Sequence, residues 1–323
     1  MSSWLLSSPW AQFLLRRGGQ SLIALSLLVL LTFMVVQLVP GDPARVAAGM
    51  DASADAVEVA RAQLGLDLPL YQQLYLYLQG LLTGDMGTSF RTGEEVTSII
   101  AIRLPFTLSI SIYAIVLSLV GSVVLGFTVA GLTKGNRNRW LDTSFSWATA
   151  VFQTLPGYVL GALLVVVFAV TLRLLPAAGA ASPESYVLPT IALALAPTCA
   201  ISRVVRREAA VILEQDYIRT TRGWRIGRTK QYFRYALPNI MASTLTLSGL
   251  VLSGMLGGAI IIERVFAWPG LGNGVINAII EKDFPVIRGI ILTVGIIAIL
   301  LYLVIDLILA AIDPRTLNAE VAS

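Results

Sequence analysis

The sequence predicts an all-α polytopic membrane protein with six transmembrane helices. Of its 323 residues, 56% are hydrophobic and only 13% are charged, whereas charged residues make up about 25% of an ordinary soluble domain. A soluble chain of this length would need a charged surface, and the same composition excludes a disordered chain. The apolar residues are gathered into long segments, and Lys and Arg are divided unequally between the segments that connect them.

Six apolar segments are candidates for membrane spans, because a helix needs roughly 20 apolar residues to cross the hydrocarbon core. The third and sixth segments are long enough to tilt. The fourth is short and contains Pro189 and Pro197, so five spans remain if this segment is re-entrant. The segments cover approximately residues 22–39, 106–132, 144–172, 187–201, 238–262 and 286–312.

The N-terminal region predicts an uncleaved membrane anchor. Arg16 and Arg17 precede an apolar run that is longer than the core of a signal peptide, and Pro40-Gly41-Asp42-Pro43 follows in place of a cleavage site. We expect a short interfacial helix over residues 4–15, within an N-terminal segment 1–21, because its tryptophans suit the headgroup level.

The distribution of basic residues predicts the orientation. With six spans both termini share one side, and that side holds fifteen of the 23 Lys and Arg residues, so it is expected to be cytoplasmic, including the tail 313–323. Residues 40–104 would then be extracytoplasmic and carry a net charge of −4. This segment is too long for a simple connection and predicts a small helical cap, punctuated by Gly65 and Gly84. Residues 105–312 would form the remaining core.

Several chemistries are excluded by what the sequence lacks. It has no histidine and one cysteine, so it contains no HExxH zinc site, no Ser-His-Asp triad and no internal disulfide. No GxxxxGK[ST] phosphate loop occurs. We therefore expect no catalytic, metal or nucleotide site. The net charge of +4 reflects the Lys and Arg residues of loops on one side of the membrane, and it does not imply binding to nucleic acid. Cys199 is expected to be a small packed hydrophobe.

Residues 203–237 form the most informative polar segment, with nine basic and three acidic residues. Asp216 can begin a short helix, which Gly223 and Gly227 interrupt. A short helix carried between two spans suits docking to a cytoplasmic partner. The alternative is an ordinary positively charged loop attracted to anionic lipid.

Polar and glycine positions inside the spans have structural interpretations. The Gly157-x-x-x-Gly161 and Gly254-x-x-x-Gly258 patterns predict close helix packing. Asp306 lies deep in the sixth segment, and we expect a structural or gate-region hydrogen bond there in preference to a proton relay.

Seven motifs, in order over nearly the whole chain, resemble the permease subunits of ABC importers for peptides, opines and nickel, specifically the B-type subunit of the dipeptide/oligopeptide group. Such a type I permease would have an external cap between its first two spans. The motifs are Pro40 to Pro43, LGLDLPLY at 64–71, GDMGTSF at 84–90, RLPFTL at 103–108, IERVFAWPGLG at 262–272, DFP at 283–285, and Asp306 with DPR at 313–315.

The resemblance implies that residues 216–226 form the helix that couples the permease to its ATPase. Where the family strictly holds a glycine, this chain has Arg225, with Gly223 and Gly227 two positions to either side. The coupling residues implied are Asp216, Tyr217, Arg219, Thr220, Thr221, Arg222, Gly223 and Arg225. An external gate or docking role is implied for Glu263, Arg264, Phe266, Pro269, Gly270, Gly272 and Asp283. The external cap motif comprises Gly65, Asp67, Pro69, Gly84, Asp85 and Gly87.

The family also implies partners and a mechanism. The chain would pair with a homologous second permease, two cytoplasmic ATPase subunits that bind ATP and Mg, and an extracytoplasmic substrate-binding protein, in a prokaryotic cytoplasmic membrane. Peptides would be translocated by alternating access, as a rigid-body switch without covalent chemistry in this chain. Nickel, another chelated metal or an opine is the alternative cargo. An ATP-independent secondary transporter or channel and an intramembrane enzyme are alternatives of other classes.

Overall fold

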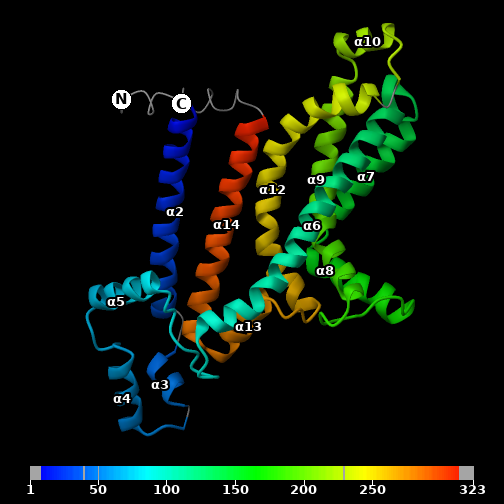
Figure 1. The fold of residues 1–323 in the computed structure, drawn as a ribbon. Helices are drawn as coiled ribbons and strands as arrows, with labels where there is room; N and C mark the ends of the chain where they lie inside the picture. The colour runs from blue at the N-terminus through cyan, green and yellow to red at the C-terminus, as the bar shows by residue number, and fades with distance from the viewer. Residues whose placement is uncertain (1–8, 39–40, 50, 228–229, 313–323) are drawn as a thin grey trace, which may run out of the picture. The chain divides into compact units, whose positions relative to one another are not determined.

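The computed structural model describes residues 9–38, 41–49, 51–227 and 230–312, and these are almost entirely helical (Figure 1). No strand occurs among the described residues apart from an isolated bridge between Thr88 and Glu95. The chain divides into two compact units. The first comprises Met1–Arg16, Ser109–Trp268 and Leu301–Ser323, and the second comprises Arg17–Leu108 and Pro269–Leu300.

Helix α9 (Val187–Ile212) is the central helix of the first unit, and α7 (Arg139–Thr154), α8 (Gly157–Leu164) and α12 (Leu237–Val265) all pack against it. Most of its buried side chains are apolar or small, so they form the core of this unit, and Cys199 is among them, as predicted.

Glycines set the closest helix approaches in the first unit. A Cβ atom on Gly126, in α6 (Val96–Thr133), would lie 2.4 Å from the carbonyl oxygen of Ser202 in α9. A Cβ on Gly161 would lie 3.2 Å from the ring of Phe266 at the end of α12. The predicted packing role of the first glycine pair is confirmed. In the second pair only Gly258 contacts a neighbouring helix, because Gly254 faces open space.

The prediction that the third span is a single helix is wrong. Helix α7 ends at Thr154, and α8 continues into a π-helix, η2 (Val165–Thr171), at an angle of 101° to α7. The cause is Pro156, because a residue before proline is driven out of the helical region, and Leu155 is extended with φ −69° and ψ 125°. The pair is a broken span or a re-entrant loop.

The weak fourth segment is a continuous helix of 26 residues. Pro189 lies in its first turn, where backbone N–H groups have no partner inside the helix. Pro197 lies inside the helix without ending it. A re-entrant fourth segment is therefore not supported, and the chain break that the sequence suggested there occurs in the third segment instead.

The separate interfacial helix expected over residues 4–15 is not seen in its described part. Helix α2 runs without interruption from Pro9 to Leu38 through Arg16 and Arg17. Gly18 and Gly19 lower helix propensity by about 1 kcal/mol each but do not forbid helical backbone, so they do not separate two elements. Residues 4–8 lie outside the described part of the chain.

Four helical stretches in the described residues are long and apolar enough to cross a membrane, or five if the bent pair counts as one span. The fifth predicted segment coincides with the 29-residue α12. The all-helical polytopic class is confirmed, and the number six stays a prediction. The four stretches are Trp10–Met34, Val96–Thr133, Pro183–Ile212 and Phe284–Ile308.

The second unit contains the predicted helical cap, with three helices between the spans: α3 (Pro43–Ala48), α4 (Ala54–Gln63) and α5 (Leu70–Thr83). Gly65 and Gly84 follow α4 and α5 with φ of 63° and 80°, a left-handed conformation that glycine adopts without strain. This agrees with their predicted role as helix terminators.

Two further helices complete the second unit: α13 (Leu271–Glu281) and the first part of α14 (Phe284–Ile312). Leu271 is the first residue of α13, so its backbone N–H has no partner inside the helix. It donates instead to Thr107 Oγ1 at 2.8 Å. Helix α14 packs closely on α2, because a Cβ on Gly295 would lie 2.5 Å from Leu28.

Candidate functional site

The predicted coupling segment folds as a short helix, α10 (Asp216–Gly223), that begins at the predicted residue but ends three residues before the predicted 226, because Trp224 and Arg225 form a turn. Ile218 is fully buried in the apolar core of the first unit, and Thr221 is 3% exposed. Thr221 Oγ1 donates to the carbonyl of Ile218 at 2.8 Å, so its hydroxyl is satisfied within the helix. One face of α10 is therefore fixed to the helical core.

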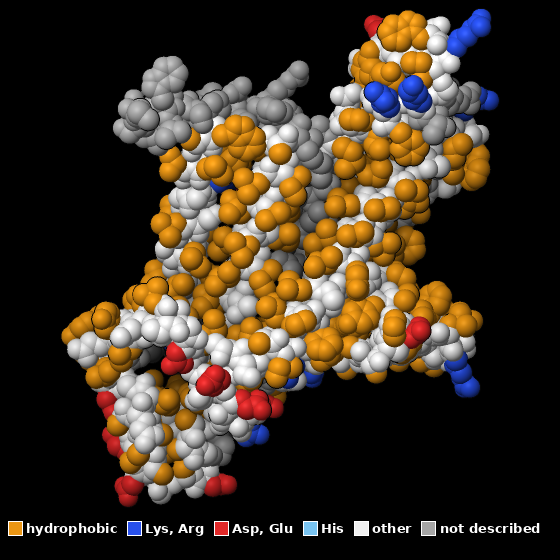
Figure 2. All heavy atoms as spheres, viewed as in Figure 1, with side chains coloured by type: hydrophobic (Ala, Val, Ile, Leu, Met, Phe, Trp, Pro, Cys, Tyr) orange, Lys and Arg blue, Asp and Glu red, His pale blue; other side chains and the backbone are white. Residues whose placement is uncertain are grey.

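The other face of α10 is open. Tyr217 is 41% exposed and Trp224, just after the helix, is 70% exposed. Asn239 Nδ2 donates to Tyr217 Oη at 3.2 Å, which ties α10 to the start of α12. Thr220 Oγ1 donates to the carbonyl of Asp216 at 2.9 Å. The side chains of Arg219 and Arg222 lie outside the described part, and Figure 2 shows other Lys and Arg side chains around this end of the unit.

Arg225 adopts the left-handed conformation, with φ of 55°. The next residue donates its backbone N–H to the carbonyl of Thr221 at 3.2 Å, and its own carbonyl accepts from Gln231 Nε2 at 3.0 Å. Gln231 is 5% exposed. The turn after α10 is thus held on both sides of Arg225, and it has the backbone geometry that a glycine would favour.

The predicted gate motif begins in the first unit with buried side chains. Glu263 is fully buried near the end of α12, and Phe266 is 1% exposed beside Gly161. Trp268 is also fully buried and meets the ring of Tyr186 edge to face, with centroids 4.6 Å apart. Of the predicted residues in this part of the motif, only Arg264 is exposed.

The rest of the motif lies in the second unit and starts α13. Gly270 is the residue before the helix, and Gly272 is buried in its first turn. Pro269, which precedes both, is partly exposed. The predicted gate residues are therefore divided between the two units.

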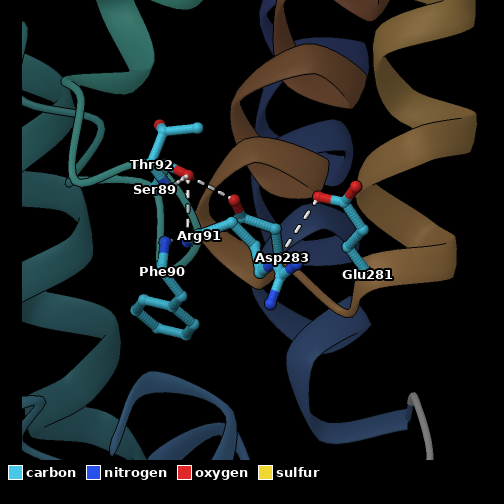
Figure 3. A network of polar contacts seen from close by, with 6 residues as sticks. All are labelled: Ser89, Phe90, Arg91, Thr92, Glu281 and Asp283. Carbon is cyan, nitrogen blue, oxygen red and sulfur yellow. Dashed lines mark hydrogen bonds and ion pairs between the residues drawn. The ribbon is translucent and has the colours of Figure 1, made fainter. Parts of the chain in front are cut away.

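A network in the second unit joins two motifs that are far apart in the sequence (Figure 3). Ser89 Oγ donates to one carboxylate oxygen of Asp283 at 2.5 Å, and the backbone N–H of Phe90 donates to the other at 3.1 Å. Ser89 and Asp283 are 4% and 3% exposed. Ser89 also accepts from the backbone N–H groups of Arg91 and Thr92 at 3.2 and 3.0 Å, so its hydroxyl closes the turn.

The rim of this network carries an exposed ion pair. Arg91 Nε lies 3.7 Å from Glu281 Oε2, and the two side chains are 60% and 48% exposed. Such a pair contributes about 0–1 kcal/mol in water. The buried hydrogen bonds of Asp283, and not this pair, attach the turn to the α13–α14 connection.

The cap motif residues have mainly conformational roles in the structure. Pro69 precedes α5, and Asp67 lies in the turn between α4 and α5. Asp85 Oδ1 accepts from the backbone N–H of Gly87 at 2.8 Å, and Gly87 has φ of 84°. Gly84 ends α5. These residues set the turns that carry the chain from α5 to Ser89.

The described residues of the Pro-Gly-Asp-Pro motif form the start of α3. Asp42 accepts from the backbone N–H of Ala44 at 3.1 Å, and Pro43 occupies the first position of α3, where its missing N–H costs nothing. The second carboxylate oxygen of Asp42 pairs with Arg61 of α4 at 2.6 Å. The motif therefore joins α3 to α4.

Sequence reasoning missed Ser89 and Tyr77 as contact residues. Ser89 stands inside a motif that was recognised, but no sequence signal pairs it with Asp283. Tyr77 contacts Thr32 of α2 and the guanidinium of Arg288 in α14, and its only signal was its place among the tyrosines of α5. Among the described residues no group of three His, Cys, Asp or Glu side chains could hold a metal ion.

Comparisons with known proteins identify the family. The family described as binding-protein-dependent transport system inner membrane component matches residues 122–318, and its N-terminal membrane component matches residues 10–111. A glutathione transport system permease protein, GsiC, of Escherichia coli strain K12 is 37% identical over 284 residues, which cover 88% of this chain and 92% of the relative. A protein of Brucella abortus strain 2308, named as a peptide transport system permease, is 34% identical over 310 residues, covering 94% and 98%.

A solved structure of the MetNI methionine ABC transporter in an inward-facing conformation shares the fold. It aligns with a TM-score of 0.56 at 17% identity, covering 67% of this chain and 96% of that chain. The resemblance drawn from the seven motifs is thus confirmed at the level of family and fold. The chain belongs to the family of inner-membrane permease components of binding-protein-dependent ABC importers, in which ATP hydrolysis is performed by separate subunits.

Proposed function

We propose that this permease subunit carries peptides of the size range that includes glutathione and dipeptides into the cytoplasm. The observation that carries the proposal is the 37% identity to a glutathione permease over nearly the full length of both chains. The relative named for peptide transport supports the same cargo class. A nickel chelate or an opine is the competing cargo within the family resemblance.

The assembly we propose contains one homologous second permease, two ATPase subunits with ATP and Mg, and an external substrate-binding protein. The excess of Lys and Arg in residues 203–237 supports a cytoplasmic location for α10 and for both termini. The net charge of −4 in residues 40–104 supports an extracytoplasmic cap available to the binding protein.

The coupling mechanism we propose follows from how α10 is attached. A force applied to its exposed face reaches Ile218, which is buried in the core of the first unit, and Tyr217, which is bonded to Asn239 at the start of α12. Closely packed interiors transmit displacement because they have little room to deform. Closure of the ATPase pair would therefore move α12 and its neighbours as a body, which is alternating access by rigid-body motion.

Reconstitution of the complete transporter tests the cargo and the energy source together. Uptake into liposomes is measured for a labelled dipeptide, for glutathione and for a nickel chelate, with the binding protein outside and ATP inside. We expect peptide or glutathione uptake that requires both components. Uptake of the nickel chelate alone would overturn the peptide assignment, and ion-driven uptake by this chain without ATP would overturn the importer assignment.

A charge exchange tests the coupling helix. Replacing Arg219 and Arg222 with Glu should abolish binding-protein-stimulated ATP hydrolysis and uptake, because the helix would repel the partner that it now attracts. The matched control replaces Arg137 and Arg139, two exposed basic residues near the start of α7. Loss of activity in the control as well, or normal activity in the α10 variant with both proteins correctly inserted, would refute the role of α10.

A further inference from the structure

Helix α5 has an exposed apolar stripe that its position in a water-facing cap would not explain. Tyr71, Tyr75, Leu78 and Leu82 follow one another at spacings of four, three and four residues, so they lie on one face of the helix. Their exposed fractions are 70%, 66%, 41% and 90%. No residue of α5 is charged and none is fully buried. The stripe is therefore a continuous apolar surface.

A polar stripe lies about 100° further round the same helix. Gln72, Gln79 and Thr83 are exposed on it, and Leu76, which is 51% exposed, is its one apolar member. The helix thus has one face for the protein, one apolar face and one mainly polar face. Such a division is typical of helices that lie in a membrane interface, with apolar side chains towards the acyl chains and polar side chains towards water.

The inward face of α5 fixes its depth, because Tyr77 is held by two membrane-spanning helices. Tyr77 Oη lies 3.0 Å from Thr32 Oγ1 in α2, and its ring lies 6.0 Å from that of Phe33. The guanidinium carbon of Arg288 in α14 lies 4.7 Å from the centre of the Tyr77 ring.

The contacts of Tyr77 lie at the ends of the apolar stretches. Thr32 and Phe33 are among the last residues of Trp10–Met34, and Arg288 follows soon after the start of Phe284–Ile308. Tyrosine and arginine at the ends of spans mark the headgroup level. Helix α5 therefore lies where these two spans leave the hydrocarbon, and Figure 1 shows it running across the end of α2.

Helix α4 in the same cap gives the contrast. It carries Asp55, Glu58 and Arg61 along its ten residues, as expected for a helix in water. In the view of Figure 2 the surface over α5 shows hydrophobic and neutral polar side chains, whereas acidic side chains lie elsewhere on the second unit.

We propose that α5 is an interfacial helix, lying in the membrane surface on the cap side with Tyr71, Tyr75, Leu78 and Leu82 in contact with phospholipid. The cap is then divided. Helices α3 and α4 stand in water, and α5 anchors them to the bilayer. This inference needs the membrane location of the family but not the cargo or the orientation proposed above.

Spin labelling of the complete transporter tests the proposal. The single cysteine of this chain is removed by Cys199→Ala, the partner subunits are used in cysteine-free form, and a nitroxide is attached at Leu82→Cys, Leu78→Cys or Val59→Cys. Val59 is the matched control, since it is 56% exposed on α4. The complex is reconstituted in vesicles of phosphatidylethanolamine and phosphatidylglycerol, and variants that retain ATP-dependent uptake are measured. Collision of each nitroxide with dissolved oxygen and with a water-soluble nickel complex reports lipid and water contact.

We expect the oxygen-to-nickel collision ratio at positions 78 and 82 to exceed that at position 59 by about tenfold, because oxygen concentrates in hydrocarbon and the nickel complex is excluded from it. Nickel accessibility at position 82 equal to that at position 59 would show a water-facing stripe and overturn the proposal. Low collision with both reagents at positions 78 and 82 would also overturn it, because the stripe would then be covered by protein.

Discussion

Replacing Asp283 with Asn should open the turn that carries Ser89 without unfolding the rest of the second unit. The Asp283 carboxylate is 3% exposed and accepts two hydrogen bonds, from Ser89 Oγ and from the backbone N–H of Phe90. Asparagine has the same shape, but it carries no charge and its amide can present an oxygen to only one of the two donors. Hydrogen bonds to charged groups contribute about 1.5–3 kcal/mol each. We expect local destabilisation of roughly 2–3 kcal/mol.

Trypsin cleavage after Arg91 measures this opening. Arg91 lies in the turn that the network closes, and a protease needs that turn to detach before it can bind the backbone. When closing is fast relative to cleavage, the cleavage rate follows the population of the open form. A loss of 2–3 kcal/mol corresponds to cleavage that is roughly 30- to 140-fold faster. Mass spectrometry of the fragments identifies the site.

The exposed ion pair supplies the control. Glu281→Gln removes the partner of Arg91 and keeps the cleavage site. Because exposed pairs contribute about 0–1 kcal/mol, the rate should rise only a few-fold. Ser89→Ala should resemble Asp283→Asn, and the effect of the double variant should be less than additive, since both changes remove the Ser89–Asp283 hydrogen bond while each also affects separate bonds to backbone N–H groups of the turn. Equal acceleration by Glu281→Gln, or additive effects in the double variant, would contradict this account.

Two further sets of substitutions test the packing and the turn geometry. Gly126→Ala should lower the thermal unfolding midpoint, because the new Cβ would clash with the carbonyl oxygen of Ser202 and such overpacking costs about 1–3 kcal/mol. Gly254→Ala is the control: its Cβ would face open space, so the midpoint should be unchanged or raised. Arg225→Gly should be tolerated, while Arg225→Val should lower the midpoint, because φ of 55° strains a β-branched residue. Lys230→Val is the control, since Lys230 has φ of −67°. Equal effects of the two valine variants would refute the strain at Arg225.

The fold class could be predicted from the sequence because apolar segment length is a strong signal, but the course of the third segment could not. Residues 144–172 carry no charged residue, so a hydropathy profile does not show the break between α7 and α8. The local signal was Pro156 followed by Gly157. Pro197, which is followed by Thr198, lies within α9 and does not end that helix. Proline therefore marks a possible break, and the packing around it decides the outcome.

The candidate site was predicted only as separate motifs. The motifs at 84–90 and 283–285 were both recognised, and the structure joins them through Ser89 and Asp283. Nothing in either motif specifies the other as its partner, because the pairing depends on how α13 and α14 return the chain to the cap. The helical boundaries of α10, in contrast, follow from local sequence, since the helix begins at Asp216 and ends at Gly223.

Arg225 shows what a departure from a family pattern does and does not imply. The sequence places an arginine where the family resemblance leads us to expect a glycine, which leaves the conformation of the turn open. The backbone instead takes the left-handed conformation, at a cost of about 1 kcal/mol for a residue with a side chain. Hydrogen bonds from Ile226 to Thr221 and from Gln231 to Ile226 hold the turn on both sides. The surroundings therefore impose the conformation, and what the substitution changes is the side chain that the loop presents, a cation beside the exposed Trp224.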